Sequence, residues 1–272
     1  MVVSKINNSM SDLVENFNII DTHFHIGKYV SSFINTDCSD NCLGLVKNLN
    51  FKKIIIIHNS FFLSLDTGIK ETLNFLSKNK NFAYGYLVYN PHYIEKSINI
   101  IEEYYGNNNI IGIKMHPEDH QCFITDIRYE DLWKIAAQKD IPILSHTWNP
   151  HVVSKNQRYA DALLFEKVVE KYPTLKIILG HAGAKDYYYF EVIKMLKRCR
   201  DKNIYIDLAG DIFYRGMIEL FVGKLGSEKI LFGTDIPWID PSYTLINVIN
   251  SDIAAIDKQN IFFNNAARLF NI

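Results

Sequence analysis

The chain has 272 residues, of which 48% are hydrophobic and 22% charged, as in ordinary soluble globular proteins. A formal net charge of −1 gives no electrostatic reason to expect nucleic-acid binding. The most apolar run, Ile54–Ile57, is too short to span a bilayer, and the polar start of the chain lacks the apolar core of a secretory signal. The four cysteines form neither a disulfide framework nor a Cys-x-x-Cys metal pair. We therefore expect a cytoplasmic protein that binds neither a membrane nor nucleic acid.

Eight short apolar runs follow one another along the chain, spaced by roughly one strand plus one helix, and we expect each to be a buried strand. These runs are Asn18–His25, Lys53–His58, Ala83–Tyr89, Ile110–His116, Pro142–Thr147, Lys176–His181, Asn203–Leu208 and Lys229–Asp235. Segments with helical spacing of apolar residues lie between and after them. They are Asp66–Asn79, Ile94–Tyr105, Tyr129–Lys139, Tyr159–Tyr172, Tyr189–Cys199, Tyr214–Leu225, Pro241–Ser251 and Asn264–Phe270.

This alternation predicts an α/β fold, a single (β/α)8 TIM barrel. We expect one domain over residues 1–272, with residues 1–17 as an N-terminal extension, because no linker or shift in composition divides the chain. An open doubly wound sheet is the rival fold. It normally brings a glycine-rich phosphate loop, and neither G-x-G-x-x-G nor G-x-x-x-x-G-K-[ST] occurs in this sequence.

Polar side chains recur at the carboxyl end of the predicted strands. They are His23 and His25 in the first run, Lys114 and His116 in the fourth, His146 in the fifth, His181 in the sixth and Asp235 in the eighth. The carboxyl ends of barrel strands form one rim, where catalytic groups converge. We therefore predict a metal site at the C-terminal ends of the strands.

The pair His23 and His25 carries the metal hypothesis, since alternate residues of a strand point to the same face. Two such imidazoles lie about 7 Å apart along the strand and can close on one divalent ion. The alternative is a pair of hydrogen-bonded core histidines. For Asp21, two residues earlier, we expect a structural hydrogen-bonding role. A carboxylate such as Asp235 at the end of an apolar strand is costly to bury without a cation or donor beside it.

Several other residues keep more than one interpretation. Lys114 could bind a substrate carboxylate, bridge two metal ions as a carbamate, or form a structural ion pair. Trp148 and Trp238 could wall the pocket or pack in the core. The remaining histidines follow strands in or near loops, and we expect them to be peripheral; they are His58, His92, His120 and His151.

The ordered motifs resemble the amidohydrolase superfamily. They are Asp21-Thr22-His23-Phe24-His25, Gly112-Ile113-Lys114-Met115-His116-Pro117, His146, Gly180-His181-Ala182-Gly183 and Leu231-Phe232-Gly233-Thr234-Asp235-Ile236-Pro237. More narrowly, the chain is similar to the amidohydrolase-related branch that contains aminocarboxymuconate-semialdehyde decarboxylase and many metal-dependent hydrolases. The terminal stretch Asn265–Phe270 resembles the last helix of that branch.

This resemblance implies a divalent ion, usually zinc, at the mouth of a distorted barrel. Carried over by position, the ligands of a single ion would be His23, His25, His146 and Asp235. His181 would bind a second ion or hydrogen-bond the catalytic water. A second ion is expected if Lys114 is carbamylated, as at this position in the two-metal members.

On this basis we expect a metal-dependent hydrolase that cleaves an amide, ester or lactone bond of a small carbonyl substrate. Asp235 would transfer the proton, His181 would orient the water, and the metal or Lys114 would stabilise the oxyanion. The alternative is a metal-dependent, non-oxidative decarboxylase of a small carboxylic acid. A non-catalytic metal-binding barrel is a weaker third hypothesis, and a nuclease is weaker still.

The expected partner is a small-molecule substrate. Residues expected to contact it are His116, Trp148, Arg158 and Arg215, the two arginines as anchors for a carboxylate in the decarboxylase alternative. The run Tyr187–Tyr189 is expected to expose aromatic side chains, which allows a homodimer contact.

Overall fold

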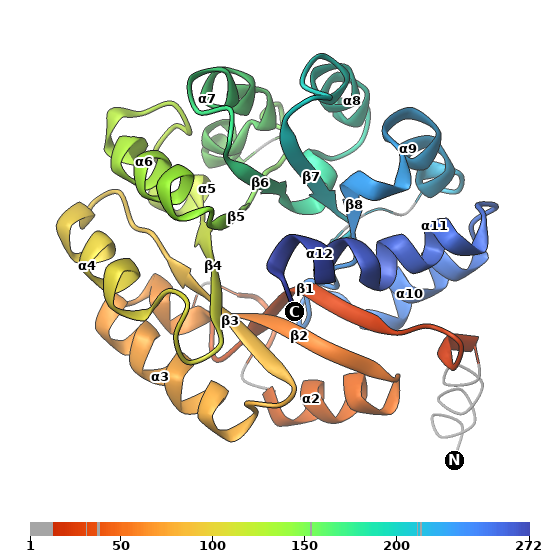
Figure 1. Cartoon of the computed structure of the whole chain (residues 1–272), viewed down its shortest axis with the longest axis horizontal. Coiled ribbons are helices and arrows are strands. Elements are labelled where there is room, and N and C mark those ends of the chain that lie inside the picture. The colour runs from red at the N-terminus through yellow and green to blue at the C-terminus, as the bar shows by residue number, and fades with distance from the viewer. Residues whose placement is uncertain (1–12, 31, 37–38, 153, 211, 213) are drawn as a thin grey trace.

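Eight parallel strands form one sheet, and each strand pairs with the next one in sequence (Figure 1). The computed structural model describes residues 13–30, 32–36, 39–152, 154–210, 212 and 214–272. The strands are β1 (Ile19–Ile26), β2 (Phe51–His58), β3 (Ala83–Val88), β4 (Ile110–Met115), β5 (Pro142–Ser145), β6 (Lys176–Leu179), β7 (Asn203–Asp207) and β8 (Ile230–Leu231). The predicted (β/α)8 barrel is therefore confirmed.

The first and last edges of the sheet meet through backbone hydrogen bonds. Thr22 N donates to Phe232 O at 3.0 Å, and Asp235 N donates to His23 O at 2.9 Å. These bonds lie at β1 and at the segment just after β8. They bring the eighth strand back to the first and form the seam of the barrel.

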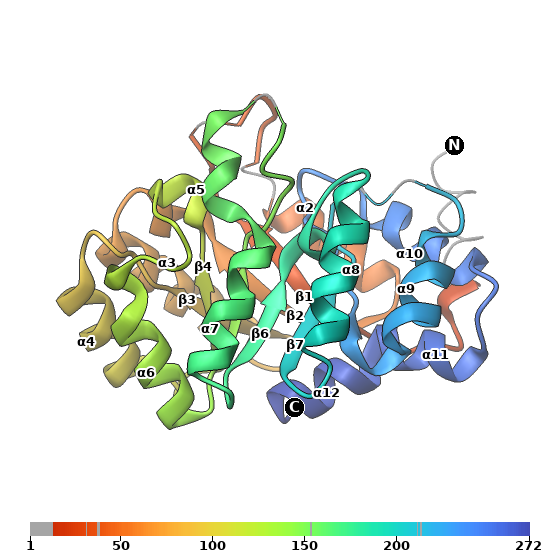
Figure 2. The same ribbon diagram turned by 90° about the horizontal axis from the view of Figure 1, so that it is seen from above.

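Helices surround the strands, as Figures 1 and 2 show from two directions. They are α2 (Ser39–Asn48), α3 (Leu65–Lys78), α4 (Ile94–Tyr104), α5 (Pro117–His120), α6 (Glu130–Lys139), α7 (Phe165–Lys171), α8 (Tyr188–Arg198), α9 (Met217–Leu225), α10 (Pro241–Asn250), α11 (Ala255–Gln259) and α12 (Asn265–Phe270). Helix α12 lies across the end of the barrel where β4, β5 and β6 begin, and its Phe270 ring is 6.0 Å from Tyr86. At the opposite end, where the strands finish, the loops that follow the strands surround the opening of the barrel.

Most predicted helices agree with the structure to within a few residues, but one predicted helix begins late, and helices α2, α5 and α11 were not predicted. The predicted helix Tyr159–Tyr172 begins only at Phe165, because Asp161 adopts an extended backbone and caps a separate short turn through Leu163 N at 3.0 Å. Helix α2 was missed, since Ser39–Asn48 contains several poor helix formers, such as Gly44.

Strand β8 is much shorter than the predicted run. The residues after it hydrogen-bond to the buried carboxylate of Asp21 instead of continuing the strand. Its Oδ1 accepts from Thr234 N at 3.1 Å and from His23 N at 3.0 Å, and its Oδ2 accepts from Thr234 Oγ1 at 2.6 Å. Burial raises the pKa of Asp21 to about 7. Asp21 therefore has the structural role expected for it, and it fixes the backbone next to Asp235.

The surface differs from expectation at the tyrosine run. Tyr187 is exposed, but Tyr188 and Tyr189 are buried, the first with its hydroxyl donating to Asp161 Oδ1 at 2.7 Å. They are buried because α8 turns these rings toward its neighbours, so the run offers less apolar surface than expected. The homodimer stays a prediction. Within the described part of the chain, no helix has both the length and the hydropathy to cross a bilayer.

Candidate active site

A pocket of about 390 Å³ lies at the carboxyl ends of the strands. The side chains that line it come from the ends of β1, β4, β5 and β6 and from the loops that follow several strands. They are His23, His25, Tyr29, Phe33, Phe62, Lys114, His116, Glu118, His146, Trp148, Gln157, His181, Gly210, Asp235, Trp238 and Ile239. The rim predicted from the strand-end pattern therefore exists, and seven of the predicted polar residues line it.

His23, His25 and Asp235 lie together at one side of this pocket, and we call them the His23 group. Asp235 Oδ1 lies 3.6 Å from the Nε2 atom of each histidine. Ligand atoms held about 2.1 Å from a tetrahedral ion are about 3.4 Å apart. Burial is the main cause that holds the pKa of both histidines well below the usual range, so both imidazoles are neutral. The donor set and its spacing fit a divalent metal ion.

Each histidine of the His23 group is held from behind through its other ring nitrogen. His23 Nδ1 lies 2.8 Å from Asp207 Oδ2, and His25 Nδ1 lies 2.9 Å from Asn59 Oδ1. Because carboxylate and amide oxygens accept hydrogen bonds, both Nδ1 atoms carry the proton and both Nε2 atoms present a lone pair. This arrangement orients imidazoles toward a metal.

Asp207 is a site residue that the sequence analysis missed. Besides His23, its carboxylate accepts from His181 N at 2.8 Å and from Ala209 N at 3.2 Å, and it is fully buried. Asp207 is the last residue of β7, so the rule of a polar residue at a strand end would have found it. Asn59 carries no such signal, because it lies in the short helical turn Asn59–Phe62 after β2.

Lys114 reaches the same place from the end of β4. Its side chain is 1% exposed, and Nζ lies 3.1 Å from His23 Nε2. Burial lowers the pKa of Lys114 from 10.5 to about 8, so the amine remains mostly protonated at pH 7. Among the described residues that line the pocket, it is the only Lys or Arg.

A second group consists of His116, Glu118 and His146, and we call it the Glu118 group. His146 Nε2 lies 3.4 Å from Glu118 Oε2, and the rings of His116 and His146 stack at 4.2 Å with 5° between their planes. Glu118 lies in the short helix α5 after β4 and was not predicted, because it is not at the end of a strand and follows no periodic pattern. By distance, His146 groups with His116 and Glu118. Its role as a ligand of the same ion as His23 stays a prediction.

His181 lies between the two groups. Its Nε2 is 3.1 Å from His146 Nδ1, and its ring centroid is 5.1 Å from that of His23. Its backbone has a φ of 59°, and Gly210 packs so closely that a Cβ there would lie 2.6 Å from His181 Nδ1. A residue larger than glycine at position 210 would therefore displace the imidazole.

Aromatic side chains form the walls of the pocket. The Trp238 ring meets His25 edge-on at 4.9 Å, and Tyr29 meets both Trp238 and Phe62 at 5.6 Å. Trp148 lies 5.2 Å from the His181 ring. Both tryptophans therefore line the pocket, as one of their two interpretations had it. Such a surface suits a flat apolar ligand.

The two predicted arginines lie outside this arrangement. Arg158 is exposed and turns back onto Tyr159, with Nη2 donating to the phenol at 2.9 Å. Arg215 is exposed on the turn before α9. Neither lines the pocket, because their loops direct them away from it. The four histidines expected to be peripheral do not line it either.

A family model described as amidohydrolase matches residues 72–272. Gamma-resorcylate decarboxylase from Polaromonas sp. is 22% identical over 182 residues, which are 53% of this chain and 55% of that protein. The chain thus spans about half the length of the curated relatives it matches.

Solved structures share the fold. The decarboxylase for 5-carboxyvanillate, LigW from Sphingomonas paucimobilis, is 12% identical with a TM-score of 0.76, over 94% of this chain and 100% of that one. A dihydroxybenzoic acid decarboxylase from Polaromonas sp. JS666, with bound manganese and the inhibitor 2-nitroresorcinol, is 16% identical with a TM-score of 0.73. That match covers 94% and 97% of the two chains.

These comparisons correct one expectation. The hydrolase expected from the sequence was wrong, since the relatives and these structural neighbours are decarboxylases. Residues of a metal site cannot separate the two reactions, because both use a divalent ion and a proton-transferring carboxyl group. The resemblance itself is confirmed: the chain belongs to the amidohydrolase family.

Proposed function

We propose that this protein is a metal-dependent, non-oxidative decarboxylase of a hydroxylated aromatic carboxylic acid. The observation that carries the proposal is one pocket that combines the His23 group, a single buried lysine and aromatic walls. The names of the sequence relatives, gamma-resorcylate decarboxylases, support the same reaction. We also propose that the small-molecule substrate is the main partner of the pocket.

The His23 group would hold the metal ion, with His181 next to it. When bound, a divalent ion would supply a Lewis acid that polarises the oxygens of the substrate. Zinc fits two imidazoles and a carboxylate, and so does manganese, which the Polaromonas structure contains. We propose either ion as functional.

Lys114 would bind the carboxylate of the substrate. Its buried ammonium pairs with an anion more strongly than an exposed one could, because the surroundings screen the charge less. This assigns to Lys114 the part expected for Arg158 and Arg215, which lie outside the pocket. The ring of the substrate would lie between the aromatic walls.

Asp235 would deliver a proton to the ring carbon that carries the carboxylate. The carbon–carbon bond then breaks, its electron pair returns to the ring, and carbon dioxide leaves. The product is the arene with hydrogen in place of the carboxylate, and a proton from water restores Asp235. A ring hydroxyl beside the carboxylate would make the carbon electron-rich enough to accept the proton.

The direct test is release of carbon dioxide from a panel of aromatic acids by protein loaded with zinc or manganese. We expect turnover of gamma-resorcylate or 5-carboxyvanillate and none of benzoate, which has no ring hydroxyl. Lys114→Met should lower kcat/KM about 30-fold or more, because the substrate carboxylate loses its buried partner. Arg158→Gln is the matched control, since it removes a cation outside the pocket and should leave the rate within twofold.

Turnover of an ester, amide or lactone panel without release of carbon dioxide would refute the proposal. Equal turnover by wild type and Lys114→Met would remove Lys114 from substrate binding. Chelated protein serves as the blank for both measurements.

A further inference from the structure

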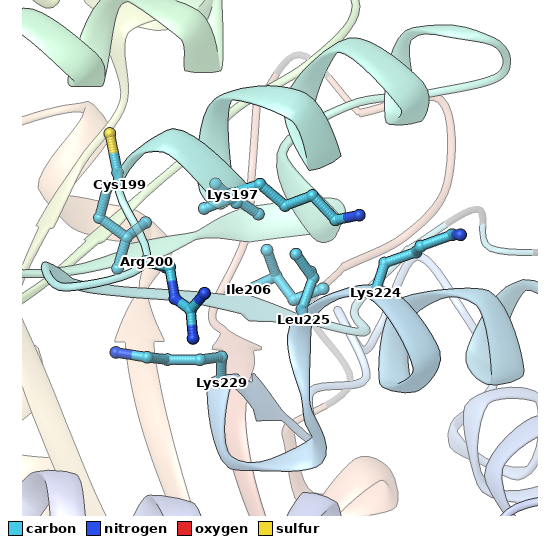
Figure 3. Close-up of a pocket in the computed structure, with 9 residues that line it drawn as sticks. Lys197, Cys199, Arg200, Ile206, Lys224, Leu225 and Lys229 are labelled. Carbon is cyan, nitrogen blue, oxygen red and sulfur yellow. The ribbon is translucent and has the colours of Figure 1, made fainter.

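A second cavity, of about 370 Å³, lies on the outer wall of the barrel between α8 and α9, and we call it the basic cavity. Figure 3 shows it in close-up, with the labelled cations arranged around Ile206 and Leu225. Its lining consists of Leu196, Lys197, Cys199, Arg200, Ile204, Ile206, Lys224, Leu225 and Lys229. Its volume is close to that of the catalytic pocket.

The basic cavity has an apolar floor. Leu196 from α8 and Ile204 and Ile206 from β7 are all buried, and Leu225 from the end of α9 is partly exposed. An apolar group placed here would make favourable contacts with these side chains and would remove from water mainly the exposed part of Leu225. The floor therefore favours a ligand with a hydrocarbon body over an inorganic ion.

The rim of the basic cavity is positively charged. Four cations line it, Lys197, Arg200, Lys224 and Lys229, and no Asp or Glu does so among the described residues. None of the four has an ion-pair partner in the described parts of the chain. The nearby Asp201 is paired with Lys202 at 3.0 Å. In a protein of net charge −1, this is a local excess of positive charge, which the carboxylate of Asp201 reduces in part at Lys229.

Stabilisation by a helix dipole explains only two of these four cations. Lys197 and Lys224 lie in the last turns of α8 and α9, where a cation complements the helix dipole. Arg200 and Lys229 lie beyond those helices. Lys229 Nζ donates to Lys202 O at 2.9 Å and lies 5.0 Å from the centre of the Tyr205 ring, and burial is the main cause that lowers the pKa of this lysine. An anion in the basic cavity would stabilise its charged form.

Strand β7 separates the basic cavity from the catalytic site. Ile206 lines the cavity, and the next residue, Asp207, points to the other face of the strand and holds His23. The two pockets share no lining residue. A ligand in the basic cavity would therefore leave the catalytic pocket open.

We propose that the basic cavity is a binding site for a small organic anion, a carboxylate, sulfonate or phosphate ester on an apolar body. The charged head group binds Arg200 and Lys229, and the apolar body covers Ile204, Ile206 and Leu225. This assignment does not depend on the reaction catalysed at the other site.

The test is a fluorescence titration of the full chain with anilinonaphthalene sulfonate, an organic anion that fluoresces when it leaves water. We expect saturable binding by the wild type and a dissociation constant at least tenfold higher for Arg200→Gln/Lys229→Gln. Leu225→Trp, which fills the cavity without changing the charge, should weaken binding as much. Circular dichroism establishes that each variant is folded.

The matched control is Lys194→Gln/Arg198→Gln, which removes two positive charges from α8 where they pair with Glu191 and Glu166 outside the cavity. Its dissociation constant should stay within twofold of the wild type. If the control weakens binding as much as the cavity variants, or if neither cavity variant weakens it, the proposal is wrong.

Two further measurements test which pocket binds the probe and whether the apolar part of the ligand contributes. Phe62→Ala, in the catalytic pocket, should leave the titration unchanged, and loss of binding there would place the probe in the wrong pocket. Inorganic sulfate should compete at least tenfold more weakly than the probe. Equal competition would show that the apolar floor adds nothing and would overturn the ligand class.

Discussion

The His23 group and the Glu118 group have the same composition, two histidines and one carboxylate, yet they are built differently. The rings of His23 and His25 are tilted by 39°, whereas the rings of His116 and His146 are stacked with 5° between their planes. A nitrogen lone pair lies in the plane of its ring, so stacked rings direct their lone pairs along parallel planes. The stacked pair is therefore less suited to sharing one ion than the tilted pair, although the ligand atoms of both groups lie close enough together to hold one.

The support behind the two groups differs as well. A buried carboxylate and an amide hold the histidines of the His23 group, whereas His116 Nδ1 accepts from Asp119 N and His146 contacts the imidazole of His181 and the side chain of Gln157. Carboxylate and amide partners behind the imidazoles are the arrangement that orients histidines toward a metal, so we expect the His23 group to be the stronger metal site. The following predictions test this difference, beginning with the largest effect.

Asp235→Asn should have the largest effect, because Asp235 is both a carboxyl side chain of the His23 group and the group proposed to carry the proton. We expect kcat to fall about 1000-fold. Steady-state kinetics and elemental analysis measure the rate and the bound metal, and part of the metal should stay with the histidines. A rate within tenfold of the wild type would remove Asp235 from the mechanism.

Lys114→Met should stabilise the metal-free protein at pH 7 by about 1–3 kcal/mol, because it removes the cost of burying an ammonium. The pKa of Lys114 is about 8 in the folded chain and 10.5 when exposed. Between these values the unfolded chain binds the proton and the folded chain does not. Wild-type stability should therefore rise with pH from about 8 to 10.5, and the variant should lack this rise.

Urea unfolding at several pH values measures this effect. Lys114→Arg is the control, because it keeps the cation and should be no more stable than the wild type. A variant Lys114→Met that is less stable than the wild type at pH 7 would mean that the ammonium is well paired in the folded protein.

Asp207→Asn should weaken metal binding about 10- to 100-fold, the usual effect of losing an outer hydrogen-bond partner. The amide can still accept from His23 but no longer carries the negative charge that makes the imidazole a stronger donor. Competition with a chromophoric chelator measures the metal affinity. Wild-type affinity in this variant would show that the histidines are aimed by packing alone.

Glu118→Gln should have the smallest effect. If the Glu118 group holds no ion, the metal content and the affinity should both stay within twofold of the wild type. The same chelator competition provides the comparison with Asp207→Asn. A loss of one bound metal ion per chain in this variant would show that the Glu118 group also binds a metal, which contradicts the prediction.

Local patterns predicted most of the fold and half of the site. Apolar runs indicated the eight strands, and alternation within β1 placed His23 and His25 on one face. Asp207 could have been predicted by the same rule, because it is a polar residue at the end of a strand. Asn59 and Glu118 were different. They lie in short helical segments after β2 and β4, and Asn59 reaches the site only through its contact with His25 Nδ1. No periodicity describes such positions.

Two other limits come from tertiary structure and from chemistry. Arg158 and Arg215 follow the right strands, but their side chains turn outward because the loops, and not the strands, orient them. The reaction was misjudged because a metal, a carboxyl group and a cation serve hydrolysis and decarboxylation alike. The aromatic walls that favour an aryl acid depend on Phe62, Tyr29 and Trp238, which come from three separate loops.

The His23 group lies at the seam of the barrel, where β1 meets β8, so a metal bound there would affect how firmly the barrel is closed. Two of its donors lie on β1 and the third follows β8, a strand of only two residues. An ion bound by all three would cross-link the first and last strands of the barrel. Loading the ion should slow amide hydrogen exchange at the edges of β1 and β8 more than in β3 or β4, so that cofactor loss and loosening of the barrel begin at the same place.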